Sequence, residues 1–301
     1  MSSRWMVTGC RGQLGRAFGD LLASDPERVL VSAVDLPEVD VADRDAVQKL
    51  FGGLREPPDF VVNAAAFTHV DRCEREPDAA HRANAVAPGL LAEACRQAGA
   101  QLVHVSTDYV FPGDGERPYT EEDPPAPRSE YGRSKLEGEL RVADALDSAL
   151  IVRSSWVFGH GRNFIAAILA QAVARREARA HGPLQVVDDQ RGRPTYAVDL
   201  AAALVTLLDA GARGLYHVTN GGVATWWEVA RASLDAVGFE DLEVERIATS
   251  ELDLPAPRPV YSVLDCSKAE ALGVRAVHWR MAVQAYLRSD HSPLVGASEA
   301  R

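Results

Sequence analysis

A glycine-rich segment near the start of the chain restricts the possible folds more than any other feature. Gly9, Gly12 and Gly15 stand in TGCRGQLG at the spacing G-x-x-G-x-x-G, directly after the short apolar run RWMVTG. The residues that follow, GQLGRAFGDLLAS, have the apolar spacing of a helix. Glycines between a strand and a helix permit a tight turn and let backbone amides approach a pyrophosphate at the positive helix end. The segment therefore predicts a dinucleotide-binding unit, with a purely structural turn as the alternative.

Strand-like and helix-like segments alternate along the first half of the chain. The predicted strands are RVLVSAVD, DFVVNAAA, QLVHVSTDYVF and SALIVRSSWVFG, and the predicted helices between them are DRDAVQKLFGGL, EPDAAHRANAVAPGLLAEACRQAG and YGRSKLEGELRVADAL. Such alternation predicts an α/β fold, a doubly wound parallel sheet of the Rossmann type with helices on both faces.

After the last of these strands the pattern becomes less regular. We expect helices at NFIAAILAQAVARREA, AVDLAAALVTLLDAG and TWWEVARASLDAVG, a strand at GLYHVTN, a Pro-rich extended stretch at LDLPAPRPVYSVLD and a frayed tail at SDHSPLVGASEAR. Residues 1–152 are predicted to form the nucleotide-binding domain. Residues 153–301 are predicted to form mainly a smaller substrate-binding lobe, with the chain crossing back to the first domain once or twice.

The composition excludes several classes of function. Of 301 residues 47% are hydrophobic, and the formal net charge is −11, which argues against nucleic acid or an anionic membrane as a partner. The four cysteines contain no CxxC pair, so we expect reduced thiols and a cytoplasmic location. The first strand begins too early to leave room for a signal peptide, and no apolar run approaches the roughly 18 residues of a membrane helix. The histidines are scattered, so no metal site is predicted.

Tyr131 and Lys135 in YGRSK form the candidate reactive pair. Lysine is rare in this chain, which contains only two others, Lys49 and Lys268. On a helix, residues four apart share one face at roughly 6 Å between their Cβ atoms. A phenol has a reference pKa of about 10, and a neighbouring ammonium lowers it. We expect Tyr131 to protonate a carbonyl oxygen as hydride arrives from nicotinamide, with Lys135 lowering its pKa and holding the nicotinamide ribose. A surface pair is the alternative.

Two residues bear on whether the cofactor is NADH or NADPH. Asp35 lies about 20 residues beyond the last glycine, where a carboxylate holds the adenosine ribose and favours the free 2′-hydroxyl of NADH. Arg11 could instead pair with the 2′-phosphate of NADPH, or be a solvated loop arginine. The sequence leaves open whether the chain prefers NADH or NADPH. The predicted cofactor-binding residues, which include small side chains that let the backbone lie close to the cofactor, are Gly9, Arg11, Gly12, Gln13, Leu14, Asp35, Asp40, Val41, Ala64, Ala65, Ala66 and Lys135.

Six motifs occur in a consistent order along the chain: TGCRGQLG, NAAAFTHVD, STDYVF, YGRSKLEGE, RSSWVFG and DDQRGRPT. Together they resemble the extended short-chain dehydrogenase/reductase superfamily, and within it the dTDP-4-dehydrorhamnose reductase family. The resemblance implies NAD(P)H-dependent reduction of the C4 ketone of a dTDP-4-dehydro-6-deoxy-L-sugar, above all of dTDP-4-dehydrorhamnose to dTDP-L-rhamnose. It also implies that Thr107 hydrogen-bonds the substrate oxygen, which gives a catalytic set of Thr107, Tyr131 and Lys135.

The dTDP-linked 4-keto-6-deoxy sugar is expected at the carboxyl edge of the sheet and in the second lobe. Trp156 could form a flat wall for the sugar ring or be a core tryptophan. Asn163 could contact the nucleobase or phosphate, and Arg193 and Arg258 are candidate diphosphate partners. The Pro-rich segment 112–130 is interpreted as a lid or as a plain surface loop. The predicted substrate-binding residues are Ser106, Thr107, Asp108, Tyr109, Phe111, Tyr131, Trp156, Asn163, Arg193 and Arg258.

Several other functions stay open. A sister nucleotide-sugar 4-ketoreductase or a dihydrostreptose-type synthase would use the same residues on another sugar. A non-catalytic NADP-binding regulatory subunit, like the beta subunit of methionine adenosyltransferase, shares the resemblance. A dehydratase or epimerase is disfavoured, because Tyr109 stands where related dehydratases have a glutamate. Some relatives bridge subunits through a metal held by a glutamate of the first helix, where this chain has Ala17, so we expect a monomer or a homodimer without such a metal.

Overall fold

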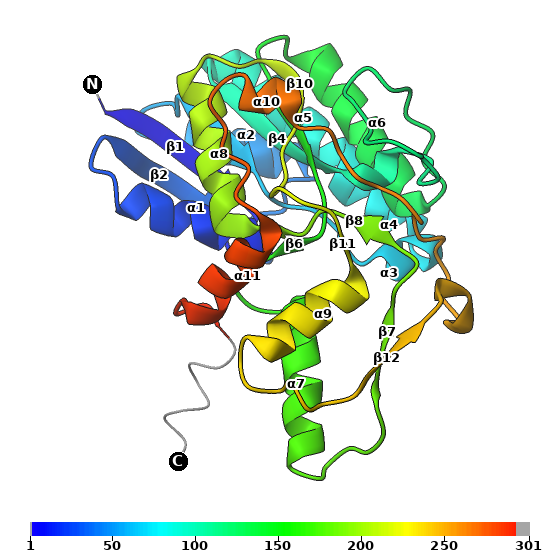
Figure 1. Cartoon of the computed structure of the whole chain (residues 1–301). Helices are drawn as coiled ribbons and strands as arrows, with labels where there is room; N and C mark the ends of the chain where they lie inside the picture. The colour runs from blue at the N-terminus through cyan, green and yellow to red at the C-terminus, as the bar shows by residue number, and fades with distance from the viewer. Residues whose placement is uncertain (1, 293–301) are drawn as a thin grey trace.

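A central sheet of six strands organises the molecule (Figure 1). The computed structural model describes residues 2–292, so most of the predicted frayed tail lies outside the described residues. The strand order is β10-β5-β4-β3-β1-β2, and every neighbouring pair is parallel. This confirms the predicted doubly wound parallel sheet. The strands are β1 Ser3–Thr8, β2 Arg28–Val34, β3 Phe60–Asn63, β4 Gln101–Thr107, β5 Leu150–Ser154 and β10 Gly214–His217.

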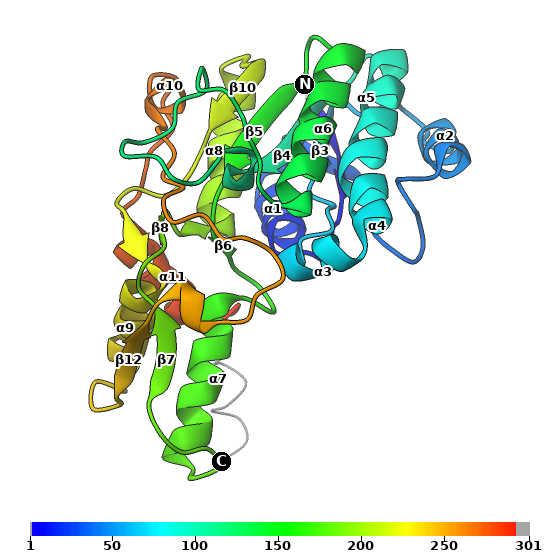
Figure 2. The same cartoon turned by 90° about the vertical axis from the view of Figure 1, so that its right-hand side faces the viewer.

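Helices cover both faces of the sheet (Figure 2). One face carries α1 (Gln13–Ala23) and α8 (Ala197–Asp209), and the other carries α2 (Arg44–Gly52), α5 (Ala87–Ala98) and α6 (Glu130–Ala145). The side chains of β1 alternate between these faces, as a pleated strand requires. Trp5 and Val7 pack in one buried cluster with Phe18 of α1, whereas Met6 packs in another with Leu91 of α5. Strands buried on both faces explain why the sequence shows continuous apolar runs.

A smaller lobe lies beside the carboxyl end of the sheet (Figure 2). Its buried cluster joins α7 (Phe164–Arg176), α9 (Trp226–Asp235) and α11 (Trp279–Arg288) to the paired strands β7 (Leu184–Val187) and β12 (Val244–Ile247). Between these elements the chain returns to the first lobe as α8 and β10, and α10 (Ser267–Glu270) contacts β10. The division at residue 152 stays a prediction. Two short strand pairs complete the lobe, β6 (Val157–Phe158) with β9 (Thr195–Tyr196) and β8 (Arg191–Gly192) with β11 (Ala224–Thr225).

Two predicted elements are divided in the structure. The strand predicted over QLVHVSTDYVF ends at Thr107, and Asp108–Val110 forms a 3₁₀ turn, because the Thr107 hydroxyl accepts a hydrogen bond from the Tyr109 N–H at 3.2 Å. The long helix predicted before β4 consists of α4 (Pro77–His81), a π-helical turn and α5. Two further short elements are α3 (Val70–Arg75) and a 3₁₀ turn at Thr249–Glu251.

The glycine loop between β1 and α1 packs its backbone against itself. A Cβ at Gly15 would lie 2.1 Å from the Gly9 oxygen, a distance that forces the backbone to move. We expect Gly15→Ala to lower the free energy of unfolding in urea by about 1–3 kcal/mol, as overpacking does. The matched control is Gly19→Ala on the same helix, where an added Cβ meets nothing within 4 Å. That variant should gain up to about 1 kcal/mol. Equal stabilities of the two variants would contradict the close packing.

Candidate active site

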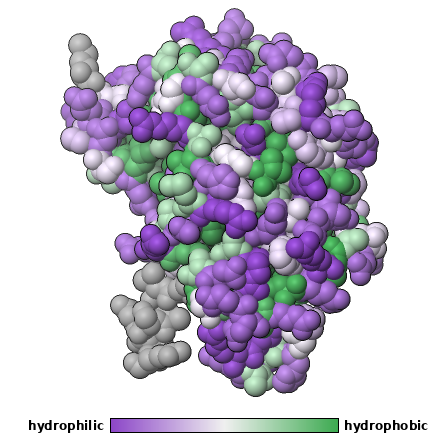
Figure 3. All heavy atoms as spheres, viewed as in Figure 1, coloured by the Kyte–Doolittle hydropathy of each residue, from purple (hydrophilic) through white to green (hydrophobic). Residues whose placement is uncertain are grey.

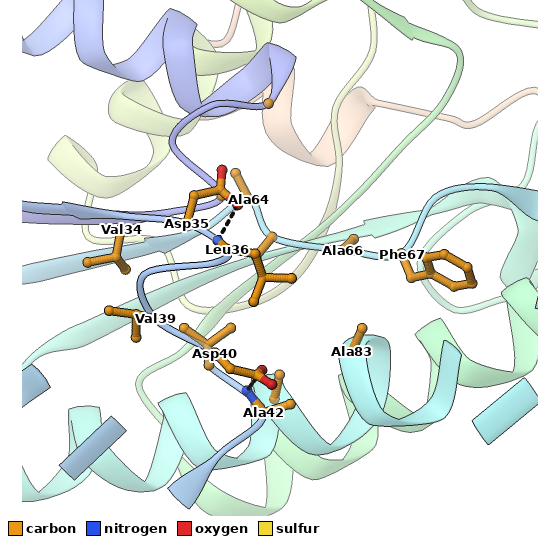
Figure 4. Close-up of a pocket in the computed structure, with 15 residues that line it drawn as sticks. Val34, Asp35, Leu36, Val39, Asp40, Ala42, Ala64, Ala66, Phe67 and Ala83 are labelled. Carbon is orange, nitrogen blue, oxygen red and sulfur yellow. Dashed lines mark hydrogen bonds between the residues drawn. The ribbon is translucent and has the colours of Figure 1, made fainter. Parts of the chain in front are cut away.

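A cavity of about 340 Å³ opens where the strand order reverses between β1 and β3 (Figure 4). In open α/β sheets this reversal point, at the carboxyl ends of the strands, is where ligands bind. The loops after β1, β2 and β3 all contribute to the lining. Of the predicted cofactor-binding residues, eight line the cavity: Gly9, Gly12, Asp35, Asp40, Val41, Ala64, Ala65 and Ala66.

The remaining predicted cofactor residues lie outside the lining. Arg11 is exposed at the rim, where its N–H donates to the Asp35 carboxylate at 2.8 Å. Gln13 donates to the Arg162 carbonyl at 3.2 Å. Leu14 is 8% exposed and packs in the core between the sheet and α8, so the structure gives it a packing role in place of a direct cofactor contact. The cavity, with its small alanines and a carboxylate at the end of β2, fits the adenosine part of a dinucleotide.

The predicted catalytic residues meet at the carboxyl end of β4. Thr107 is the last residue of that strand, and its hydroxyl forms a side-chain hydrogen bond with Tyr131. Tyr131 stands in the first turn of α6, which Ser129 caps by accepting the Gly132 N–H at 3.1 Å. Lys135 follows one turn later and is 2% exposed. The structure therefore places a hydroxyl, a phenol and an ammonium group along one strand end and one helix face.

Burial dominates the pKa values in this group, and the expected lowering of the Tyr131 pKa by Lys135 stays a prediction. Desolvation raises the pKa of Tyr131, and the hydrogen bond with Thr107 is what opposes this rise. The Lys135 ammonium donates to the Val105 carbonyl at 2.7 Å. Burial lowers the pKa of Lys135 to about 8, while Glu139 on the next turn opposes that shift. The lysine is thus a buried cation held by the backbone of β4, and the phenol stays protonated.

Asp108 is the second unusual acid of the site. It is 2% exposed, and its Oδ1 accepts the Thr107 hydroxyl at 3.0 Å. Its Oδ2 has no hydrogen-bond partner among the described residues. Burial raises the pKa of Asp108 to about 6, and hydrogen bonds with Ser262 and Thr107 oppose the rise. The ionised form of this buried carboxylate therefore lowers the free energy of unfolding at neutral pH.

The Asp108→Asn variant tests this cost. The pKa of Asp108 is about 6 in the folded chain against 3.8 for the free side chain, so the folded state binds the extra proton and loses stability as pH rises through 6. Asparagine has no such loss. We expect the variant to be more stable than the parent at pH 8 by at most about 3 kcal/mol, and this difference to vanish near pH 4. Thermal unfolding at both pH values measures it. Asp144→Asn, on the exposed face of α6, should match the parent at both. A constant difference at all pH values would show that ionisation is not the cause.

Other predicted substrate residues lie around the catalytic group. The rings of Tyr109 and Tyr131 meet edge to face with centroids 5.5 Å apart. Ser106, on the same strand as Thr107, is buried, and its hydroxyl has no partner among the described residues. Phe111 is 1% exposed and stacks on Tyr119 at 4.4 Å. It packs in a hydrophobic cluster and also lines a small pocket with Tyr109 and Arg258, so its predicted contact with substrate stays a prediction.

The segment 112–130 is anchored in the structure. The Tyr119 N–H donates to the Val263 carbonyl at 2.8 Å, and the Tyr119 carbonyl accepts the Asp265 N–H at 2.7 Å. Within the segment, the side chains of Arg117 and Asp123 form an ion pair at 2.7 Å. The two Tyr119 hydrogen bonds hold the middle of the segment against the second half of the chain, which favours the surface-loop interpretation over a free lid.

The residues predicted in the second lobe have diverse contacts. Trp156 stacks on Trp226 with ring centroids 3.7 Å apart. Asn163 is the N-cap of α7, since its Oδ1 accepts the Ala166 N–H at 3.0 Å and its Nδ2 donates to the Tyr286 hydroxyl at 2.8 Å. The cap occupies most of the hydrogen-bonding capacity of Asn163, and its predicted substrate contact stays a prediction.

The two predicted diphosphate partners differ in how they are engaged. Arg258 donates to Asp71 at 2.7 Å and to the Ala256 carbonyl at 3.0 Å, so a substrate phosphate would compete with an existing carboxylate. The Nε of Arg193 is buried without a hydrogen-bond partner among the described residues. An unpaired buried guanidinium nitrogen is costly, which makes Arg193 the better candidate for an anionic ligand.

Asn84 and Ser134, to which the sequence assigns no chemistry, have a positioning role in the structure. Asn84 is fully buried in the π-helical turn Arg82–Val86. Its side chain accepts the Phe67 N–H at 2.8 Å and donates to the Phe67 carbonyl and the Ser134 hydroxyl, both at 3.0 Å. It thereby ties the loop after β3, part of the cavity, to the helix that carries Tyr131 and Lys135. A π-helical turn inside a longer helix often marks such a site, but spacing alone does not reveal it.

Two features are absent from the part of the chain that the structure describes. No group of three or more histidine, cysteine, aspartate or glutamate side chains among residues 2–292 is placed to hold a metal ion. Within residues 2–292, no helix is both long and apolar enough to cross a membrane. Ala17, the residue relevant to metal-bridged dimers, is buried under α8.

The parallel sheet, together with Thr107, Tyr131 and Lys135 at the carboxyl end of β4, defines the extended short-chain dehydrogenase/reductase class. Within it, the chain belongs to the dTDP-4-dehydrorhamnose reductase family, because residues 3–291 match the family model described as RmlD substrate binding domain. A dTDP-4-dehydrorhamnose reductase of Streptomyces griseus is 42% identical over 288 residues, covering 93% of this chain and 91% of that protein. The resemblance seen in the motifs is confirmed.

Two further relatives extend the comparison. A probable dTDP-4,6-dihydroxy-2-methyloxan-3-one 4-ketoreductase of Streptomyces antibioticus is 40% identical over 298 residues, 96% of this chain and 98% of that protein. The crystal structure of dTDP-4-dehydrorhamnose reductase from Bacillus anthracis in complex with NADP superposes with a TM-score of 0.87 at 32% identity, covering 95% of this chain and 99% of that one.

Proposed function

We propose that this protein reduces the C4 ketone of a dTDP-4-dehydro-6-deoxy-L-sugar with NADH or NADPH, and that its substrate is dTDP-4-dehydrorhamnose. The observation that carries the proposal is the grouping of Thr107, Tyr131 and Lys135 at the carboxyl end of β4. The cavity at the strand reversal supports it, because it offers a dinucleotide site on the same edge of the sheet. Relatives that are 40% and 42% identical bear the reductase name.

The chemistry assigned to each side chain follows from its position. A bound nicotinamide cofactor supplies the hydride. Tyr131, a protonated phenol, donates its proton to the oxygen of the sugar ketone as that oxygen becomes a hydroxyl. The hydroxyl of Thr107 orients the phenol and the substrate oxygen. Lys135, with a pKa of about 8, carries its charge at neutral pH and stabilises the phenolate that the proton transfer leaves behind.

Absorbance at the reduced-nicotinamide band tests the proposal. Purified protein is mixed with dTDP-4-keto-L-rhamnose generated in situ, with NADH and NADPH in parallel. We expect absorbance to fall in step with a product that contains two more hydrogens than the substrate. If cofactor binds but absorbance stays constant with this sugar, the substrate assignment is wrong and the non-catalytic regulatory subunit becomes the better explanation.

A sister 4-ketoreductase is the second candidate. It is favoured by the 40% identity to the Streptomyces antibioticus protein, whose printed name describes a 4-ketoreductase acting on another dTDP-linked keto sugar. The discriminating experiment offers both keto sugars to one enzyme preparation and compares kcat/KM. A higher value for the second sugar would replace the rhamnose assignment and keep the reaction.

The proposal also covers the cellular location and the oligomeric state of the protein. A cytoplasmic enzyme is consistent with four cysteines that are free in the described structure. A monomer or a homodimer is proposed, and light scattering coupled to size exclusion distinguishes the two.

A further inference from the structure

We propose that Glu139, held in place by Arg153, is a positioning residue for the reaction, and that its carboxylate keeps the ammonium of Lys135 charged inside the fold. The inference rests on the proposed function, because it names the group that prepares Lys135 for the role given there. Glu139 lies on α6 one turn beyond Lys135, and Arg153 lies on β5. Neither Glu139 nor Arg153 lines the cavity at the strand reversal.

The ion pair of Arg153 and Glu139 is unusual because it is buried. The Nε and Nη2 atoms of Arg153 donate to the two carboxylate oxygens at 2.9 and 2.6 Å, and the two side chains are 4% and 6% exposed. Every other ion pair among the described residues has at least one side chain that is 34% exposed or more, and hydrophilic residues cover much of the surface in Figure 3. Burial of two charges often costs more than their attraction returns, and a packed apolar pair would join α6 to β5 as well. The cost favours a use for the charges themselves.

Lys135 is the group on which the Glu139 carboxylate can act. Residues four apart share one face of a helix, and both of these side chains are buried. The Lys135 ammonium donates to the Val105 carbonyl, a neutral acceptor, at 2.7 Å. Burial lowers the pKa of Lys135 to about 8, and Glu139 is the group that opposes this shift. Such an interaction acts across several ångströms in a protein interior, because the effective dielectric constant there is lower than in water.

Arg153 fixes where the carboxylate lies. Both oxygens of Glu139 are engaged by its guanidinium, which lies over the ring of Phe111 at 4.9 Å from the ring centroid. A carboxylate held at both oxygens does not swing toward Lys135 to form a direct ion pair. The ammonium therefore keeps its charge through Glu139 and its position through Val105. In the proposed reaction this leaves N–H groups of Lys135 for the nicotinamide ribose.

The other titratable groups around this lysine and its phenol partner do not replace Glu139. These groups are His104, Cys73, Tyr131 and Asp108. Burial lowers the pKa of His104 and raises the pKa values of Cys73 and Tyr131, so these three groups are uncharged at neutral pH. Asp108, whose pKa is about 6, is an anion above that pH, and its charge acts on Tyr131. Among the described residues, the carboxylate of Glu139 is thus the anion that acts on the lysine.

Nuclear magnetic resonance of the protein labelled with carbon-13 at the lysine Cε atoms tests the inference without any substrate. The chain contains three lysines, of which Lys49 and Lys268 are exposed, and the third signal is assigned by its loss in Lys135→Ala. Glu139→Gln alone leaves Arg153 as an unpaired buried cation, which is strongly destabilising, so the test variant combines Glu139→Gln with Arg153→Gln. We expect the Lys135 signal to titrate near pH 8 in the parent and about one pH unit lower in the double variant. The other two signals should not move.

The pH dependence of turnover provides the second measurement. A lysine whose pKa is about 7 in place of about 8 is charged in roughly one tenth of the molecules at pH 8, against about half in the parent. We therefore expect kcat/KM of the double variant to be about fivefold below that of the parent at pH 8, and less than about twofold below it at pH 6. Glu137→Gln is the matched control, because Glu137 pairs with Arg141 on the exposed side of the same helix. This variant should leave the Lys135 signal and the pH profile unchanged.

The outcomes separate this inference from the proposed function. An unchanged Lys135 midpoint in the folded double variant would overturn the inference. An equal loss of kcat/KM at both pH values would also overturn it, because such a loss indicates a structural defect. A folded parent that binds cofactor but does not reduce the keto sugar would overturn the proposed function, while the lysine signal would still report whether Glu139 acts on Lys135.

Discussion

Replacing Tyr131 with phenylalanine is expected to lower kcat/KM for the keto sugar by roughly two to four orders of magnitude, the usual contribution of a positioned proton donor. We propose the phenol as the acid that the reduction requires, and its hydroxyl is hydrogen-bonded with Thr107 at the end of β4. Phenylalanine keeps the ring and its edge contact with Tyr109. The cofactor Kd should therefore stay within twofold, measured by calorimetry on the same preparation.

A matched variant separates the loss of a proton donor from the loss of any tyrosine hydroxyl. Tyr196 is 5% exposed, and its hydroxyl forms a side-chain hydrogen bond with Ser289 in the second lobe. Tyr196→Phe removes that hydroxyl and should retain most of the turnover. Turnover by Tyr131→Phe equal to that of Tyr196→Phe would remove Tyr131 from the acid role, whatever the effect on stability.

Replacing Lys135 with alanine is expected to lower turnover at least as strongly and, in addition, to weaken cofactor binding about tenfold or more. Lys135 is buried one turn from Tyr131, and its ammonium donates to the Val105 carbonyl. The variant loses the charge that we propose stabilises the phenolate and the donor proposed for the nicotinamide ribose. Steady-state kinetics and calorimetry report the two losses separately.

Lys268→Ala supplies the control for a lysine that also donates to a backbone carbonyl. Its ammonium reaches the Leu215 oxygen at 2.7 Å and lies over the Tyr216 ring, but the side chain is exposed on α10. Removal of the Lys268 side chain should leave the turnover and the cofactor Kd close to those of the parent. An unchanged cofactor Kd in Lys135→Ala would refute the ribose role, and a loss of turnover alone would restrict Lys135 to tuning the phenol.

The fold of the first lobe could be predicted from local patterns, because its strands are continuous apolar runs and its helices have regular spacing. Strands β7 and β12 could not, since each has four residues and pairs with a partner about 60 residues away. Their stability comes from the cluster around Trp279 and Leu234, which no local pattern displays.

The candidate site likewise has features that local patterns predict and features that depend on contacts between distant parts of the chain. The spacing of Tyr131 and Lys135 predicted a shared helix face, because helical geometry alone determines it. The desolvation that raises the pKa of Tyr131 depends on distant segments packed around it, which no local pattern displays. Phe111 and Asn163 were assigned to substrate because they stand in motifs. Their roles in core packing and helix capping depend on Tyr119 and Tyr286, partners that only the folded chain brings near.

The return of the chain through α8 and β10 has a consequence for how enzymes of this design can diversify. The segment Ala197–His217 covers and extends the nucleotide-binding sheet, yet in the gene it interrupts the region that encodes the smaller lobe. Exchange of one contiguous stretch of coding sequence cannot replace the smaller lobe without also removing part of the sheet. If that lobe holds the sugar, as proposed, new specificities are expected to arise in this scaffold by substitution at individual positions more readily than by exchange of whole modules.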